Sequence, residues 1–278
     1  MTRIGSARLV CLDSGLQRGA APYFDTLTRG KTLLELALLF VAALTAGAIN
    51  ALAGGGSFIT LPALLFYGLP PTVANATSAA AVLPGYATTL FRFRKDVAPP
   101  AALSLVWMIA IAAAGGISGA LLLLATGDRA FSAIVPWLML VATAIFAAAP
   151  WLKRLIASRE ASPPLAAIAL YLACSYGGYF NGGVGIIVIA VLGLLVQSRL
   201  LTSVAMKAVM SATLTTISVT VYALFGLIDW PLALLMATGA MLGGWIGASF
   251  GHRIAPQWHR AGIVLIGLVM TVAMFMRG

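Results

Sequence analysis

Two glycine-rich stretches decide the fold of this chain, Asn50-Ala-Leu-Ala-Gly54-Gly55-Gly56-Ser57 and Tyr179-Phe-Asn181-Gly182-Gly183-Val-Gly185. Each lies in a long uncharged run, and each is followed by an apolar segment too short for an ordinary membrane span. Clustered glycines destabilise a helix. In lipid, such a break persists only where protein or a wet cavity surrounds it. Each stretch therefore predicts a helix, a glycine break and a short second helix.

The composition around these stretches is that of a membrane protein. Of the 278 residues, 61% are hydrophobic and 9% are charged, whereas soluble domains carry roughly 25% charged residues. The 56 residues from Leu36 to Phe91 contain no charged side chain, and one span needs only about 20 residues. This excludes a cytosolic enzyme, a disordered chain and a disulfide scaffold, and Cys11 and Cys174 are expected to be inert thiols. We assign the net charge of +10 to loops that orient the protein, and expect no nucleic acid partner.

The uncharged runs predict an all-α membrane protein, because they lack the polar–apolar alternation of barrel strands. A shift of 128 residues places Gly54 and Gly55 on Gly182 and Gly183, and Gly115 on Gly243. We expect about eight transmembrane helices in two pseudo-repeats of ~128 residues, each with a glycine-broken helix and a short re-entrant helix. The expected domains are a basic cytoplasmic N-terminal tail (1–31), a first repeat (32–152), a basic linker loop (153–163) and a second repeat (164–278). The Gly-x-x-x-Gly ladder of Gly239, Gly243 and Gly247 predicts close helix packing.

The loop charges bear on topology. With re-entrant short helices and a cytoplasmic N-terminus, twelve basic residues fall on the cytoplasmic side and four on the far side. With short helices that cross fully, the split is seven against nine. The positive-inside rule favours the first arrangement, which has both chain ends in the cytoplasm and favours parallel over inverted repeats.

Lys207 is the clearest candidate for chemistry, since every other residue from Leu200 to Ile228 is uncharged. An ammonium inside a bilayer costs at least ~2.5 kcal/mol, so we expect it to attract an anion, with snorkelling to the interface as the alternative. The helices after the glycine breaks would direct free N–H groups towards the same anion. Neutral donors that could share the cavity are Asn50, Asn75, Thr77, Ser78, Asn181 and Ser211.

No enzyme site is expected. His252 and His259 have no carboxylate cluster beside them, and no nucleophile has a paired base. We therefore predict no catalytic residue, no metal and no cofactor. Only Glu35 among the acids lies within a candidate span, so a buried carboxylate relay is not evident.

The stretch Asn50–Leu65, its continuation Gly68–Ser78, the repeated Gly178–Gly185 and Ala205-Met-Lys207 resemble the signatures of the TauE/SafE sulfite exporter family. The resemblance covers nearly all of residues 32–276. It implies a bacterial inner-membrane transporter for sulfite, sulfonates or related organic anions. The residues implied to line its substrate site, together with those that start the two short helices, are Asn50, Gly54, Gly55, Gly56, Ser57, Thr77, Ser78, Asn181, Gly182, Gly183, Gly185 and Lys207. Ser57 stands where many relatives have glycine, and Val184 interrupts the second glycine run.

The sequence thus predicts a secondary transporter that exports a small sulfur-containing anion by alternating access around a central anion site. Uptake of another small organic anion, such as a carboxylate, is one alternative, and an intramembrane enzyme is another. The expected partners are the anion and the lipid bilayer, with a homodimer left open.

Overall fold

The computed structural model describes residues 32–52, 54–100, 103–156, 162–195, 200–250 and 256–276. The tail of residues 1–31, which includes Cys11, lies outside the described residues, as does His252. In the linker 153–163, residues 157–161 lie outside them, and the side chains of residues 153–156 are not described. The chain divides into a unit that ends at Leu38 and a unit that begins at Leu39. In the first unit, Thr32 and Glu35 cap the start of a helix reciprocally, Thr32 N to Glu35 Oε2 at 3.1 Å and Glu35 N to Thr32 Oγ1 at 3.4 Å.

The described residues form helices and contain no strand, as the sequence predicts. Four helical segments are long and apolar enough to cross a membrane, and shorter apolar helices accompany them. The elements are α2 (Leu33–Leu52), α3 (Ser57–Tyr67), α4 (Pro71–Phe93), the 3₁₀ turn η1 (Arg94–Asp96), α5 (Leu105–Ile156), α6 (Pro163–Tyr179), α7 (Val184–Leu195), α8 (Leu200–Leu224), α9 (Trp230–Phe250) and α10 (Pro256–Phe275).

Glycines in the left-handed region mark the helix breaks. Gly54 (φ +85°) lies between α2 and α3, and Gly183 (φ +74°) lies between α6 and α7. Both predicted breaks, each with a short second helix, are therefore confirmed. Gly127 (φ 69°) divides α5 into two helical segments, so that α5 covers two of the expected spans. Gly68 (φ 105°) ends α3, and its N–H bonds to the carbonyls of Leu64 and Leu65.

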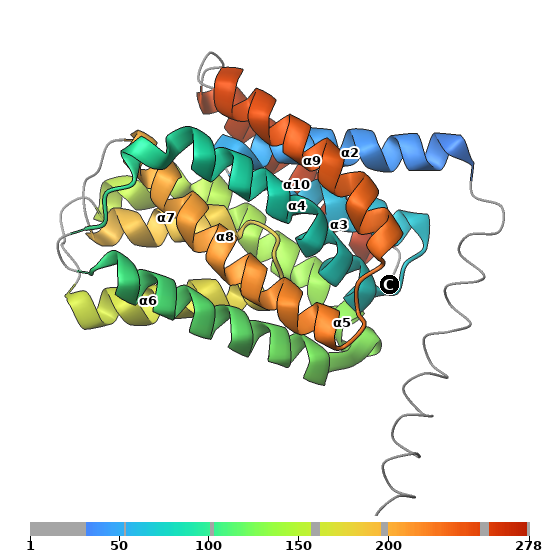
Figure 1. The fold of residues 1–278 in the computed structure, drawn as a ribbon, viewed down its shortest axis with the longest axis horizontal. Coiled ribbons are helices and arrows are strands. Elements are labelled where there is room, and N and C mark those ends of the chain that lie inside the picture. The colour runs from blue at the N-terminus through green and yellow to red at the C-terminus, as the bar shows by residue number, and fades with distance from the viewer. Residues whose placement is uncertain are drawn as a thin grey trace, which may run out of the picture. The chain divides into compact units, whose positions relative to one another are not determined.

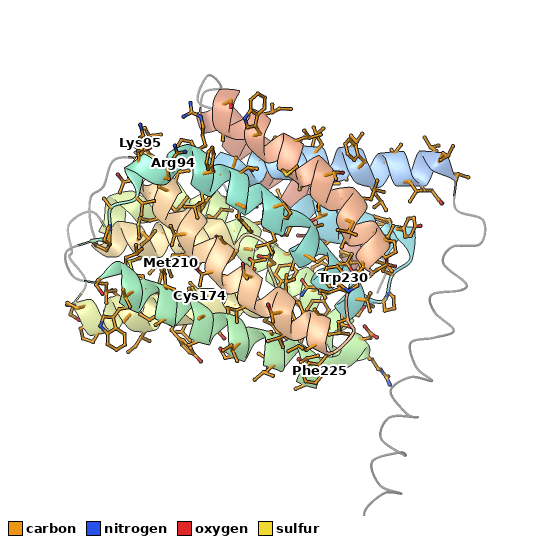
Figure 2. All side chains as sticks on the ribbon, in the orientation of Figure 1. Arg94, Lys95, Cys174, Met210, Phe225 and Trp230 are labelled. Carbon is orange, nitrogen blue, oxygen red and sulfur yellow. The ribbon has the colours of Figure 1, made fainter. Side chains whose placement is uncertain are left out.

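Contacts between the helices of the second unit define two opposite ends of that unit. At the first, called here the Thr72 end, Asp128 Oδ1 accepts hydrogen bonds from Thr72 N (3.0 Å) and Thr72 Oγ1 (2.7 Å). Asp229 lies at the same end, because its N–H donates to Thr77 Oγ1 (3.0 Å). At the opposite end, called the Phe93 end, an apolar cluster joins α2, α4, α8 and α9 through Ala51, Phe93, Val204, Ala205 and Ala248. Figure 1 shows the helices between these ends, and Figure 2 shows Arg94 and Lys95 at one end and Phe225 and Trp230 at the other.

The two broken helices are hairpins that open towards opposite ends. From Leu39 on, α2 runs parallel to α9 towards the Phe93 end, because Gly239 contacts Phe40 and Gly247 contacts Ala48. Helix α3 then returns to the Thr72 end, where α4 begins. Helix α6 runs parallel to the first segment of α5 towards the Thr72 end, and α7 returns towards the Phe93 end, where α8 begins.

The glycine ladders pack helices closely, as their spacing predicts. Gly239, Gly243 and Gly247 of α9 lie against the backbone of α2. Gly115 and Gly119 of α5 lie against α6, at Cys174, Ser175 and Gly178. Each ladder therefore lies against the broken helix of the other half. The pairs of helices that the 128-residue shift relates also run in opposite directions: α4 runs towards the Phe93 end and α8 runs away from it. These directions are those of inverted halves, whereas the loop charges favour parallel ones.

Candidate substrate site

The tips of the two hairpins touch through glycine backbone. A Cβ atom on Gly54 would lie 2.6 Å from the Cα of Gly185, and one on Gly185 would lie 2.7 Å from the Cα of Gly54. Such distances leave no room for a side chain on either residue. Two segments more than a hundred residues apart, both predicted to line the site, are thereby brought together.

Two short helices begin at this contact. The first bonded amides are Phe58 N to Gly55 O (3.1 Å) in α3 and Ile186 N to Gly183 O (3.0 Å) in α7. No described residue accepts a hydrogen bond from the amides of Ser57, Val184 or Gly185. Each helix start carries about +0.5 elementary charge from its dipole. Two helix starts next to each other favour a negative ligand.

Lys207 is fully buried, so the snorkelling alternative does not describe it. Its Nζ donates to the carbonyl oxygens of Asn50 (2.7 Å) and Ala51 (3.2 Å), in the last turn of α2. Its Cδ lies 3.0 Å from where a Cβ on Gly185 would be, so the side chain passes the second hairpin tip. An ammonium has three protons, and protein carbonyls take two of them. No described residue accepts a hydrogen bond from the third.

Three buried polar side chains of the predicted site have no hydrogen-bond partner in the described structure. They are Asn50, 2% exposed and at the end of α2, Ser57, 4% exposed and at the start of α3, and Asn181, 4% exposed and between α6 and α7. Buried polar groups are paired in the great majority of cases. Unpaired groups at both hairpins therefore indicate a place for water or substrate.

The other predicted site residues have partners within the protein. Thr77 Oγ1 accepts the hydrogen bond of Asp229 N, and Ser78 Oγ shares one with Thr60 Oγ1 at 2.6 Å. A Cβ on Gly56 would meet Ala46 O at 2.5 Å, and Gly182 O accepts from Tyr176 at 2.9 Å. Gly183 lies against the ring of Phe58, and the carbonyl oxygen of Gly55 accepts a hydrogen bond from the Phe58 amide. These contacts shape the hairpin tips and join α4 to α3 and α9.

The family of the chain follows from comparison with known proteins. The sequence profile described as Sulfite exporter TauE/SafE matches residues 39–274. The chain belongs to the TauE/SafE family. This TauE/SafE match includes both hairpins and Lys207. No solved structure matches the chain.

Curated relatives of this TauE/SafE chain carry transporter names. A "Probable membrane transporter protein" of Haemophilus influenzae is 29% identical over 246 residues, which cover 86% of this chain and 94% of the relative. "Probable membrane transporter protein ORF9" of a Sinorhizobium species is 28% identical, covering 85% and 91%. "Probable membrane transporter protein YfcA" of Escherichia coli K12 is 28% identical, covering 86% and 88%. The chain is thus a multi-pass membrane protein of a transporter family, and the names indicate a transporter rather than an enzyme.

Sequence reasoning missed one residue of this region, Tyr86 of α4. Its hydroxyl lies beside the side chains of Asn50 and Ser211, although none of these groups makes a hydrogen bond of ordinary geometry. Helical spacing was an available signal for Ser211, which lies one turn after Lys207 on the same face of α8. Tyr86 lies on another helix, α4, far in sequence from both Lys207 and the glycine breaks.

The described residues contain no group of three or more His, Cys, Asp or Glu side chains that could hold a metal ion. Cys174 is buried, and its Cβ packs against Gly115 between α5 and α6. Nothing in this packing gives the thiol a part in the substrate site.

Proposed function

We propose that this TauE/SafE family member is a secondary transporter of a small sulfur-containing oxyanion, sulfite or an organosulfonate. The observation that carries the proposal is the meeting of both hairpin tips beside the buried ammonium of Lys207. In this account, the anion sits at the tips and receives hydrogen bonds from Lys207 and from the first amides of α3 and α7. Asn50, Ser57 and Asn181 add neutral donors.

Charge balance supports a negative substrate. Lys207 contributes one positive charge, the starts of α3 and α7 about +0.5 each, and the ends of α2 and α6 about −0.5 each. The sum is about +1 elementary charge, which suits an anion. No described carboxylate lies within ion-pair distance of Lys207. Its ammonium charge could therefore be paired by an anionic ligand.

Alternating access follows from the two hairpins in this proposal. Each opens towards a different end, and only their tips meet at the site. Rocking of one half against the other would expose the anion to each end in turn. Export is the proposed direction, and uptake of a small carboxylate is the competing function.

We also propose a bacterial inner-membrane location with the Phe93 end in the cytoplasm. The described basic residues other than Lys207 belong to segments near this end, with only Arg129 at the Thr72 end. Those at the Phe93 end are Arg92, Arg94, Lys95, Lys153, Arg154 and Arg260. Because α2 runs towards the Phe93 end, this orientation competes with the cytoplasmic N-terminus that the sequence predicts.

Flux into proteoliposomes tests the function. We expect saturable uptake of sulfite or methanesulfonate by the wild-type protein, and a loss of about a hundredfold or more in Lys207→Ala, since a charge-assisted hydrogen bond and its ammonium are removed. Ser218→Ala on the same helix is the matched control, because its hydroxyl bonds to backbone carbonyls. Unchanged transport in Lys207→Ala would remove Lys207 from the mechanism, and acetate transport without sulfite transport would favour the carboxylate alternative.

A further inference from the structure

Three buried side chains next to Lys207 form a polar cluster on α2, α4 and α8. Asn50 is 2% exposed, Tyr86 is 1% exposed and Ser211 is 0% exposed. The Tyr86 hydroxyl lies beside the other two side chains. None of the polar atoms of these side chains has a hydrogen-bond partner in the described structure.

The cluster is contiguous with the site at the hairpin tips. Asn50 belongs to both, since its backbone carbonyl accepts from Lys207 Nζ while its side-chain amide faces the cluster. Ser211 follows Lys207 by one helical turn, so both side chains leave the same face of α8. A ligand in contact with the Lys207 ammonium would therefore lie next to the cluster.

Several other buried hydroxyls of α4 and α8 do have partners, although Thr215 of α8 is also without one in the described structure. Ser218 Oγ donates to Gly116 O (3.1 Å) and Leu214 O (2.9 Å), and Tyr222 OH donates to Gly178 O. Thr89 Oγ1 donates to Gly85 O at 2.8 Å, less than one turn from Tyr86. The interior can therefore satisfy a serine, a tyrosine or a threonine. Leaving Asn50, Tyr86 and Ser211 unpaired is costly unless a ligand or water pairs with them.

We propose that Asn50, Tyr86 and Ser211 form a specificity subsite that selects anions with three oxygen atoms on one centre, such as sulfite and sulfonates, over carboxylates. This rests on the proposed function. A carboxylate has two oxygens, and Lys207 with the tip amides can serve both. A third oxygen on a pyramidal or tetrahedral sulfur points out of that plane and needs its own donors. The Tyr86 hydroxyl, the Ser211 hydroxyl and the Asn50 amide supply them.

The test compares Tyr86→Phe and Ser211→Ala with two matched controls, Tyr222→Phe and Ser218→Ala. Affinities for sulfite, methanesulfonate and acetate are measured on the purified full chain by calorimetry, with thermal unfolding as a check on folding. We expect each cluster variant to bind sulfite and methanesulfonate about tenfold or more weaker, with acetate affinity little changed. The controls are expected to keep the wild-type ratio of sulfite to acetate affinity. Tyr86→Phe and Ser211→Ala should not lower the melting temperature, because each removes a group without a partner, whereas Tyr222→Phe should lower it.

An unchanged ratio in both cluster variants overturns the subsite, whether the affinities fall together or stay the same. Lys207→Met separates the two proposals. If Lys207→Met loses all anion binding while the cluster variants keep the wild-type ratio, the transporter proposal stands and the subsite is wrong. If the cluster variants lose the ratio and Lys207→Met still binds sulfite, the subsite stands and the role of Lys207 is wrong. A wild-type protein that binds none of the three anions overturns both.

Discussion

The two halves of the molecule share a backbone arrangement but differ in side-chain chemistry. Each half has a glycine-broken hairpin, and each has a glycine ladder against the broken helix of the other half. In contrast, Lys207, Ser211 and Thr215 of α8 correspond, at the 128-residue shift, to Ala79, Leu83 and Ala87 of α4. Both halves thus contain the same backbone features, but only the second half carries the buried lysine. In the transport proposal, the halves jointly build the site, and one of them supplies the cation.

A second ammonium at the corresponding position of α4 would be unfavourable, because like charges repel strongly in a low-dielectric interior. The first half contributes instead the carbonyls that hold Lys207 in place, those of Asn50 and Ala51. This arrangement predicts that backbone changes at the glycines of either half damage folding, whereas changes to the unpaired polar side chains affect transport.

The largest effect is expected where the halves are alike, at the contact of the two tips. Gly54→Ala places a Cβ 2.6 Å from the Gly185 Cα and forces alanine to a φ of +85°. We expect a loss of about 3 kcal/mol or more in stability, since left-handed strain and overpacking add. Thermal unfolding and the yield of monodisperse protein measure it. Gly193→Ala is the control, because nothing lies within 4 Å of its Cβ position. Wild-type stability in Gly54→Ala would show that the tips do not touch.

The second effect concerns the unpaired side chains that differ between the tips, Ser57 on the first and Asn181 on the second. Ser57→Ala and Asn181→Ala are each expected to lower sulfite flux about tenfold, as one hydrogen bond to a charged ligand is lost. Stability should stay within about 0.5 kcal/mol of the wild type. A destabilised variant with normal flux would assign these side chains to the fold instead of the site.

A smaller effect is expected from the hydroxyls of α4 that have partners. Ser78→Ala breaks the buried bond to Thr60, and Thr77→Val removes the acceptor of the Asp229 amide. We expect each to cost about 1–2 kcal/mol in stability and to leave the substrate affinity of the folded protein unchanged. Binding measured by calorimetry on the folded fraction decides this. A large loss of sulfite affinity would restore both residues to the site, as the sequence predicts.

The features that sequence reasoning predicts are those with a local cause. Helix breaks follow from glycine clusters, close packing from the Gly-x-x-x-Gly ladder, and the buried cation from one lysine in an uncharged run. The direction of each helix has no such local signal, because in the sequence it can be predicted only from the few charges in the loops. Partners across the fold are equally invisible in sequence. Thr77 and Ser78 looked available as donors, yet residues on α3 and before α9 pair with them, and Tyr86 joins Asn50 and Ser211 only through tertiary packing.

The smallest effect on the protein is expected from cysteine substitutions that test whether the two halves run in opposite directions. In a Cys11→Ser, Cys174→Ala background, we expect Arg129→Cys and Phe225→Cys to react with an impermeant maleimide from the same side of intact cells. The structure places both at the Thr72 end, since Asp128 and Asp229 bind α4 there. Lys95→Cys, at the Phe93 end (Figure 2), should react only after permeabilisation. Labelling of Arg129→Cys and Phe225→Cys from different sides would contradict the helix directions.

Anomalous diffraction from crystals soaked in selenite examines the central claim, that both hairpin tips and Lys207 bind one oxyanion. Selenite has the pyramidal shape and charge of sulfite, and its selenium atom can be located without ambiguity. We expect a single strong peak within hydrogen-bonding reach of Lys207 Nζ and of the amides that begin α3 and α7. Selenium bound only elsewhere, with the Lys207 ammonium held solely by the carbonyls of Asn50 and Ala51, would contradict it.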